Sequence, residues 1–180
     1  MHEDCERVIL TEEEIAERVK EAAAWLDERF RGTTPVAVCN LKGSAMFFCD
    51  LVRAMQTDVE LDFMAVSSYG NDTIAAGRPK IKKHLFSSVA GRDVILAEDI
   101  VDTGRTLVTL RNFFEERGAK SLTVVTLLDK PSRRKVNVSA DFTCFTIEDA
   151  FIVGYGLDYA EKYRNLPYIA ILKREIYEHD

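Results

Sequence analysis

The 180-residue chain contains little cysteine, histidine or proline: four Cys, three His and four Pro. No two cysteines form a CxxC pair and the histidines are scattered, so the sequence predicts neither a disulfide scaffold nor a zinc site. It also offers no Ser/His/Asp or Cys/His constellation for nucleophilic catalysis. Such sparse cysteine is typical of a reducing compartment, and we expect a cytoplasmic location.

Long apolar runs and an excess of positive charge are also missing. No apolar run approaches the ~20 residues that span a bilayer, and the acidic start, residues 1–6, does not resemble a secretory signal. The formal net charge is −6, from 24 Lys+Arg against 30 Asp+Glu. We therefore expect no membrane partner and no nucleic-acid partner. With 47% hydrophobic and 30% charged residues, the composition is that of a globular protein with one domain, residues 1–180.

Strand and helix patterns alternate along the chain. A capping box of Thr11 and Glu14 begins an amphipathic helix that reaches Phe30, and Ser44 is a good N-cap for a second helix through about Ala54. Buried strands are predicted at 35–41, 59–67, 94–97 and 122–128, and a third helix follows residue 106. This order predicts an α/β fold with a mostly parallel, twisted sheet flanked by helices. Residues 142–180, with the N-terminal segment, are expected to form a small hood over one edge.

The densest chemical signal follows the strand at 94–97. Three acids, Glu98, Asp99 and Asp102, precede the sequence Thr103-Gly104-Arg105-Thr106, which opens a helix. Free N–H groups and the positive dipole end of a helix N-terminus favour phosphate. Acids beside a phosphate need sugar hydroxyls or a divalent cation, so the pattern suggests a ribose 5-phosphate with Mg²⁺. The alternative, that Asp102 and Thr103 only cap a helix, leaves the other two acids unexplained.

The run Val94–Thr106 resembles the phosphoribosyl-pyrophosphate motif of type I phosphoribosyltransferases: four apolar residues, two acids, two apolar residues, then Asp-Thr-Gly-x-Thr. Other segments are similar to the hypoxanthine-guanine branch of that family, in its compact bacterial form. They are Leu41–Ser44, Ser67–Gly70, Lys130-Pro131 with Arg133-Arg134, Phe151–Tyr159 and Tyr163–Ile169. The similarity spans nearly the whole chain in order, and it implies the type I phosphoribosyltransferase fold with a small C-terminal hood.

The resemblance implies a reaction and roles for the motif. The 5-phosphoribosyl group of phosphoribosyl pyrophosphate would pass to N9 of hypoxanthine or guanine, releasing pyrophosphate with Mg²⁺ as cofactor. Thr103, Gly104, Arg105 and Thr106 would hold the 5′-phosphate. Glu98 and Asp99 would bind the ribose hydroxyls, directly or through Mg²⁺. Asp102 would lie near N7 of the purine as general base or acid.

The resemblance also implies a purine pocket. Lys130 would donate to the exocyclic O6, a role that suits 6-oxopurines and not adenine. The Phe151 ring would stack on the purine, the Ile152 backbone would meet its edge, and Asp158 would contact Mg²⁺ or the pocket. Without the resemblance, Lys130 would be a surface lysine, Phe151 a core residue and Asp158 a solvated acid.

Lys42, Gly43 and Arg164 would bind pyrophosphate, and the Leu41–Lys42 peptide is expected to be cis, as it can be in relatives. For Arg164 the alternative is a surface ion pair. Residues 69–83 are polar, with two glycines and a proline, and predict a long loop. Ser68 and Tyr69 would begin a lid that excludes water.

Some positions depart from the family pattern. Glu148-Asp149-Ala150, Ala75-Ala76 and His84 stand where other residues are usual, which leaves the choice among hypoxanthine, guanine and xanthine open. A homodimer or homotetramer is expected. Two other functions stay open: an RNA-binding regulator on the same fold, which the net charge disfavours, and a dinucleotide enzyme, which lacks the G-x-G-x-x-G fingerprint.

Overall fold

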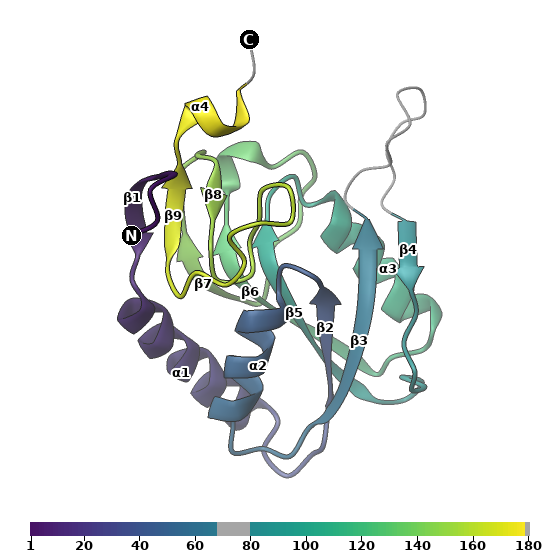
Figure 1. The fold of residues 1–180 in the computed structure, drawn as a ribbon. Coiled ribbons are helices and arrows are strands. Elements are labelled where there is room, and N and C mark those ends of the chain that lie inside the picture. The colour runs from purple at the N-terminus through teal and green to yellow at the C-terminus, as the bar shows by residue number, and fades with distance from the viewer. Residues whose placement is uncertain (68–79, 179–180) are drawn as a thin grey trace.

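A computed structural model describes residues 1–67 and 80–178 of the chain. Its main feature is a six-stranded sheet in the order β4-β3-β2-β5-β6-β7 (Figure 1). The strands are β2 (Val36–Leu41), β3 (Glu60–Ser67), β4 (Lys80–Lys83), β5 (Asp93–Val101), β6 (Ser121–Asp129) and β7 (Phe142–Thr146). All neighbours pair in parallel except β3 and β4. The predicted α/β class is confirmed.

Helices cover both faces of this sheet, because its central strands are apolar on both sides. On β2, Ala37 and Cys39 pack with α1 (Glu12–Arg29) and α2 (Ala45–Ala54). The alternate residues Val36 and Val38 pack with α3 (Arg105–Glu116) on the other face. The strand period of two therefore divides the core into two layers.

The helix starts agree only partly with the sequence prediction. Thr11 and Glu14 form the predicted capping box at α1, with N–H to side-chain distances of 3.2 and 2.8 Å. Ser44 stands at the N-cap of α2, as predicted, but its side chain makes no capping hydrogen bond. Its hydroxyl donates instead to the Asn40 carbonyl at 2.6 Å, because the residue has helical backbone angles and its side chain turns back toward β2.

A smaller antiparallel sheet stands beside the carboxyl ends of the main strands (Figure 1). It contains β1 (Cys5–Leu10), β9 (Ile169–Leu172) and β8 (Ile152–Val153), and the short α4 (Arg174–Tyr177) follows it. Residues 142–146, which we expected in this hood, are instead the edge strand β7 of the main sheet. Their carbonyl and amide groups pair with β6, so the hood sheet takes its strands from residues 5–10 and 152–172.

The predicted loop at 69–83 falls largely outside the described residues. Its last four residues, Lys80–Lys83, form β4, which pairs antiparallel with the end of β3. The sequence signal for this strand was hidden because three of its four residues are lysines, and lysine is common on exposed edge strands.

Candidate active site

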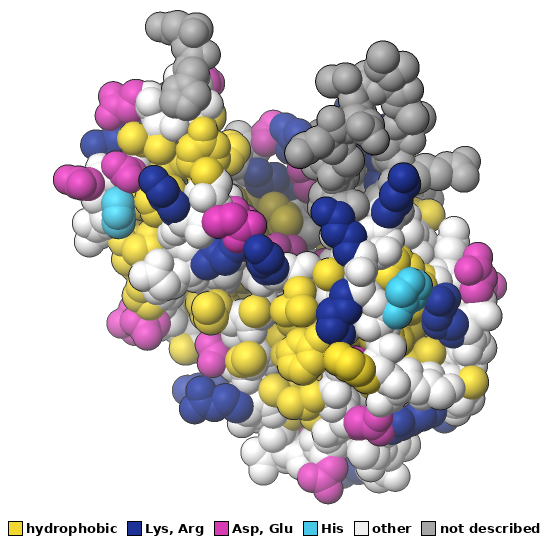
Figure 2. Space-filling view, turned by 45° about the vertical axis from the view of Figure 1, so that its right-hand side comes forward, with side chains coloured by type: hydrophobic (Ala, Val, Ile, Leu, Met, Phe, Trp, Pro, Cys, Tyr) yellow, Lys and Arg dark blue, Asp and Glu magenta, His cyan; other side chains and the backbone are white. Residues whose placement is uncertain are grey.

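The site residues gather where β5 ends, beneath the smaller sheet. Figure 2 shows a hollow between the lobe that carries the smaller sheet and the body of the main sheet, with acidic and basic side chains around it. Ligands of open α/β sheets bind at this end of the strands. The structure therefore brings segments far apart in sequence to the place that the sequence motif indicated.

Glu98 lies at the base of this region and is 3% exposed. Both of its carboxylate oxygens accept hydrogen bonds from the Asn40 side-chain Nδ2 at 3.1 Å, and the Asn40 side-chain Oδ1 accepts from the Val66 N–H at 3.2 Å. Burial, with the neighbouring Asp99, raises the pKa of Glu98 to about 8. Asn40 was not singled out from the sequence; its only signal was a buried amide in an otherwise apolar strand.

Asp99 lies against the loop after β2. A Cβ added to Gly43 would stand 1.6 Å from Asp99 Oδ2, so only glycine fits there. A Cβ on Gly156 would in turn meet the Gly43 carbonyl oxygen at 2.0 Å. Burial raises the pKa of Asp99 to about 6, although the hydrogen bond that it accepts from the Ile100 N–H acts in the opposite direction. These close approaches hold together the end of β5, the loop after β2 that contains Gly43, and the loop after β8 that contains Gly156.

The segment predicted to bind the 5′-phosphate forms a tight turn into α3. Gly104 has φ +82°, a left-handed conformation that favours glycine, and its carbonyl accepts from the Val108 N–H at 3.1 Å. Val136 and Val138 pack so closely over Gly104 that an added Cβ would clash with both. The N–H of Arg105, the first residue of α3, donates to the Thr103 hydroxyl at 3.4 Å, and this turn closely follows the acids at the end of β5.

The segment after β6 is hydrogen-bonded to this turn. The N–H groups of Lys130 and Lys135 donate to the carbonyls of Val101 and Thr103 at 3.0 Å. Arg134 Nε donates to the Asp102 carbonyl at 3.1 Å. Residues 130–135 and 101–103 thus form one unit, which holds the predicted purine-binding lysine beside the predicted general base.

Asp102 is ion-paired. Arg133 Nε lies 2.9 Å from Asp102 Oδ1, and the same guanidinium lies 3.3 Å from Asp149. Arg133 was noted in the sequence only as a mark of the family, without a role. Gly104, and neither Asp102 nor Thr103, is the residue at the N-cap of α3, although the Thr103 hydroxyl accepts from the Arg105 N–H at 3.4 Å.

The structure does not place Lys130 on the surface or Phe151 in the core, which were the alternatives to their predicted roles. Lys130 is 7% exposed, and its ammonium donates to the Ala150 carbonyl at 2.6 Å with Asp149 at 3.8 Å. Burial lowers the pKa of Lys130. The Phe151 ring is 39% exposed and stacks on Tyr177 with centroids 4.5 Å apart. Ile152 is buried in β8. Lys130 is therefore no surface lysine, and Phe151 is no core residue.

The predicted pyrophosphate residues also come together. The Leu41–Lys42 peptide is cis, as expected. Lys42 forms an ion pair with Glu161 at 3.0 Å, and Arg164 forms ion pairs with Glu161 at 3.2 Å and Asp158 at 2.8 Å. Lys42 and then Arg164 lower the pKa of Glu161. Glu161 is a second residue that the sequence did not single out.

Among the described residues, the three acids predicted to hold Mg²⁺ do not form a complete ligand set by themselves. Within the described chain, no three His, Cys, Asp or Glu side chains are arranged to hold a metal ion by themselves. Glu98 is engaged by Asn40, whereas Asp99 and Asp158 both lie close enough to Arg164 to feel its charge. Ser68 and Tyr69, the predicted start of the lid, lie outside the described residues.

A mostly parallel sheet with a strand that ends in acids, followed by a glycine turn into a helix, defines an α/β enzyme that binds a sugar phosphate. The comparisons with known proteins are specific. Residues 8–160 match the family model "Phosphoribosyl transferase domain". The chain is 53% identical over 178 residues to the hypoxanthine-guanine phosphoribosyltransferase of Bacillus subtilis, covering 99% of each chain.

Further relatives agree. The hypoxanthine-guanine phosphoribosyltransferase of Streptococcus thermophilus is 46% identical, with 98% of each chain covered. A crystal structure of the hypoxanthine phosphoribosyltransferase of Staphylococcus aureus superposes with a TM-score of 0.94 at 47% identity, covering 99% of this chain and 97% of that one. The chain therefore belongs to the phosphoribosyltransferase family, in its hypoxanthine-guanine branch, and the resemblance seen in the sequence is confirmed.

Proposed function

We propose that this chain transfers the 5-phosphoribosyl group of phosphoribosyl pyrophosphate to N9 of hypoxanthine or guanine, giving IMP or GMP and pyrophosphate. The observation that carries the proposal is the junction at the end of β5. There a helix N-terminus, the buried Glu98, the half-buried Asp99 and the buried Lys130 lie within one connected unit. These groups suit a phosphoribosyl donor, which carries a phosphate and sugar hydroxyls. They also suit a purine whose oxygen accepts a hydrogen bond.

The donor would lie along the turn and across the β2 loop. The first-turn N–H groups at Thr103, Gly104, Arg105 and Thr106 would bind the 5′-phosphate. Asp99 would accept the ribose hydroxyls, with Glu98 beneath it. Gly43 would leave room for the pyrophosphate, whose charge Lys42 and Arg164 would neutralise.

The purine would lie between the 130–135 segment and Phe151. The ammonium of Lys130, with only donors to offer, fits the O6 acceptor of a 6-oxopurine and mismatches the amino group of adenine. An unmatched buried pair costs about 1–3 kcal/mol, enough to make adenine a poor substrate. One face of the partly exposed Phe151 ring stacks on Tyr177, and the other face would stack on the base. The Ile152 backbone would meet the base edge.

Asp102 would act as the general base or acid at N7. Arg133 Nε donates to its Oδ1 at 2.9 Å, which fixes the orientation of the carboxylate. Taking the proton from N7 would raise the electron density of the purine ring and assist formation of the bond between N9 and the ribose carbon, and returning it would assist the reverse reaction. Positioned proton transfer of this kind contributes roughly 10²–10⁴-fold in rate.

Mg²⁺ fits the residues at this site as a shared ion. Mg²⁺ binds oxygen, often through one or two carboxylates together with substrate phosphates and water. Asp99 supplies such a carboxylate, and its raised pKa reflects a buried charge that a cation would favour. Asp158 is the second. Bound Mg²⁺ would neutralise the pyrophosphate as negative charge develops on the leaving group.

The test is an assay of nucleotide formation with phosphoribosyl pyrophosphate and Mg²⁺, offering hypoxanthine, guanine, xanthine and adenine separately. We expect nucleotide from the 6-oxopurines and little from adenine. Folded protein that binds the donor and turns over none of the four bases would contradict the proposal. Tight RNA binding in that case would favour a regulatory protein on this fold.

We also propose self-association and a cytoplasmic location. Leu61 and Phe86 are 48% and 83% exposed, an apolar surface that a second copy could cover. All four cysteines are free thiols, in keeping with a reducing compartment. Within residues 1–67 and 80–178, no helix is both long and apolar enough to cross a bilayer.

A further inference from the structure

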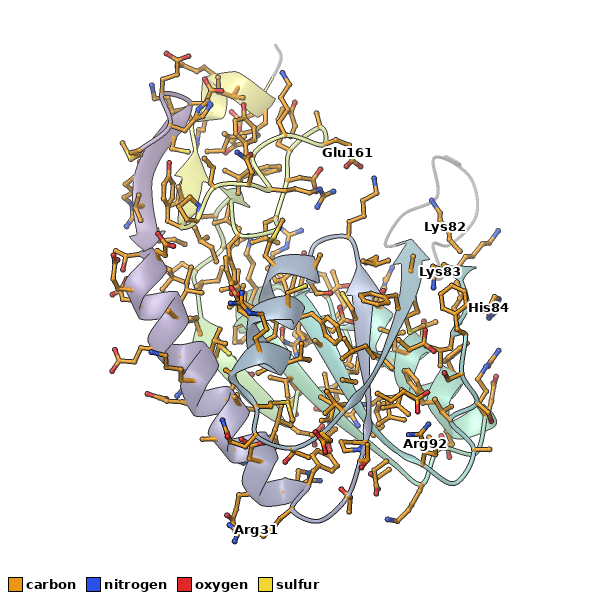
Figure 3. All side chains as sticks on the ribbon, turned by 60° about the horizontal axis from the view of Figure 1, so that its bottom comes forward. Arg31, Lys82, Lys83, His84, Arg92 and Glu161 are labelled. Carbon is orange, nitrogen blue, oxygen red and sulfur yellow. The ribbon has the colours of Figure 1, made fainter. Side chains whose placement is uncertain are left out.

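One carboxylate already joins the two cations that the proposed function assigns to pyrophosphate. Glu161 Oε1 lies 3.0 Å from Lys42 Nζ, and Glu161 Oε2 lies 3.2 Å from an Arg164 nitrogen. Lys42 follows β2 of the main sheet, whereas Arg164 belongs to the hood loop between β8 and β9. Figure 3 shows Glu161 on that loop. The two oxygens of a single side chain therefore connect the two sides of the site.

The backbone of the hood loop sets Glu161 in this place. Glu161 has φ +64° and the preceding Ala160 has φ +51°, a left-handed conformation that is uncommon for residues with a side chain. The Glu161 N–H donates to Asp158 Oδ2 at 2.9 Å. Residues held in such conformations persist where the surroundings impose them, and they gather at functional sites.

The Glu161 carboxylate contacts Lys42 and Arg164 as an anionic ligand would, and this contact is exposed to solvent. Glu161 and Lys42 keep 64% and 66% of their side-chain surface exposed. Arg164 is more fixed, because it also donates to the Gly156 carbonyl at 2.7 Å and pairs with Asp158 at 2.8 Å. Pyrophosphate would need the same donors on Lys42 and Arg164, and its negative charge would repel the Glu161 carboxylate.

We propose that Glu161 is an internal counter-ion of the pyrophosphate site. Its carboxylate binds Lys42 and Arg164 while the site is empty, moves into solvent when pyrophosphate arrives, and returns as pyrophosphate leaves. Glu161 thereby weakens the binding of pyrophosphate and promotes its release. The inference rests on the proposed function, since that function assigns pyrophosphate to these two cations.

The test compares Glu161→Gln with the wild type. Magnesium pyrophosphate is titrated by calorimetry, with magnesium alone as the blank, and its inhibition against phosphoribosyl pyrophosphate is measured. Losing two exposed ion pairs that compete with the ligand should tighten pyrophosphate binding about 3- to 10-fold. The KM for phosphoribosyl pyrophosphate should fall with it, while the KM for hypoxanthine stays unchanged.

Glu28→Gln is the matched control, because it makes the same change of net charge. Glu28 is an exposed glutamate paired with Arg31, and Figure 3 places Arg31 at the opposite end of the molecule from Glu161. We expect this variant to bind pyrophosphate as the wild type does. An equal gain in Glu28→Gln would assign the effect to net charge and overturn the proposal.

Other outcomes separate this inference from the proposed function. If the wild type forms nucleotide and Glu161→Gln binds pyrophosphate within twofold of it, or more weakly, Glu161 is no competitor and the inference fails alone. A folded wild type that binds no pyrophosphate and forms no nucleotide would refute the proposed function, and this inference with it.

Discussion

The two ends of β5 carry acids in opposite electrostatic situations. At the start of the strand, Asp93 accepts hydrogen bonds from Lys120 and Ser121 at 2.9 and 2.6 Å, and these bonds lower its pKa. Near the far end, burial raises the pKa of Glu98 to about 8 and that of Asp99 to about 6. Asp93 has its hydrogen-bond partners within the fold. Burying the charged forms of Glu98 and Asp99 costs free energy, and a bound ligand can offset that cost.

This difference separates structural from functional acids more clearly than sequence does. All three are acids on one strand, nine residues long. What distinguishes them is whether a cation bonds directly to the acid: Lys120 donates to Asp93, whereas burial is the largest influence on the pKa values of Glu98 and Asp99. Perturbed carboxyls without such a partner gather at functional sites. The comparison predicts that changes at the end of β5 affect activity first, and that changes at its start affect stability alone.

Asp102→Asn should give the largest effect. The amide keeps the shape of the side chain but cannot take a proton, so kcat should fall about 10²–10⁴-fold. Binding of phosphoribosyl pyrophosphate should change much less, because the turn at 103–106 remains. Steady-state kinetics together with a donor-binding titration would measure both.

Asp93→Asn makes the same chemical change at the opposite end of the strand and serves as the control. We expect its kcat to match that of the wild type. Unchanged turnover in Asp102→Asn would remove Asp102 from the mechanism. A large loss in Asp93→Asn would erase the proposed division between the two ends.

Gly43→Ala should give the next largest loss of activity. The new Cβ would lie 1.6 Å from Asp99 Oδ2, so Asp99 or the loop must shift by more than an ångström. Displacements of that size cost about 10²-fold in catalysis. The measurement is kcat/KM for phosphoribosyl pyrophosphate.

Gly91→Ala is the matched change near the start of β5. An added Cβ there meets nothing within 4 Å, and only its φ of +69° opposes it. This variant should lose about 1 kcal/mol of stability and keep its activity. Equal activity losses in both alanine variants would mean that Gly43 matters for its backbone and not for the approach of Asp99.

The smallest effects are the pH dependences of stability, and they have opposite signs. Glu98 has a pKa near 8 in the folded chain and 4.5 as its ordinary value. The folded state keeps this proton while the unfolded chain loses it, so the free energy of unfolding falls as pH rises from 4.5 to 8. Glu98→Gln should remove this penalty and be more stable than the ligand-free wild type at pH 8 by about 1–3 kcal/mol.

Asp93 behaves in the reverse way. Its pKa is lowered from 3.8, so its contribution is complete above pH 3.8 and is lost as pH falls further. Asp93→Asn should therefore cost about 0.5–1 kcal/mol at pH 7 and nothing at the acid end of a denaturant series. The difference in stability between each variant and the wild type is measured against pH. If both differences change with pH in the same direction, the comparison is contradicted.

The strand and helix order was predictable because it depends on local signals. Thr11 and Glu14 define the start of α1, and the apolar runs define β2, β5 and β6. The errors fall where tertiary contacts override those signals. Ser44 occupies the N-cap of α2, but its hydroxyl donates back to Asn40 and makes no capping bond. Phe142–Thr146 joins the main sheet through pairing with β6.

The candidate site divides in the same way. The acids, the glycine turn and Lys130 were visible because they form contiguous motifs. Asn40, Arg133 as the partner of Asp102, and Glu161 were missed, since each acts on a residue 31 to 119 positions away. No local pattern marks such a residue.

The sequence by itself determined the family, the class of fold and the residues with chemical capacity, because periodicity, capping and the 94–106 motif are local properties of the chain. Only the tertiary structure decided which acids keep their protons, which cations are already paired, and which glycines have no room for a side chain. Those properties depend on burial and on the distances between segments, which exist only once the sheets have packed together.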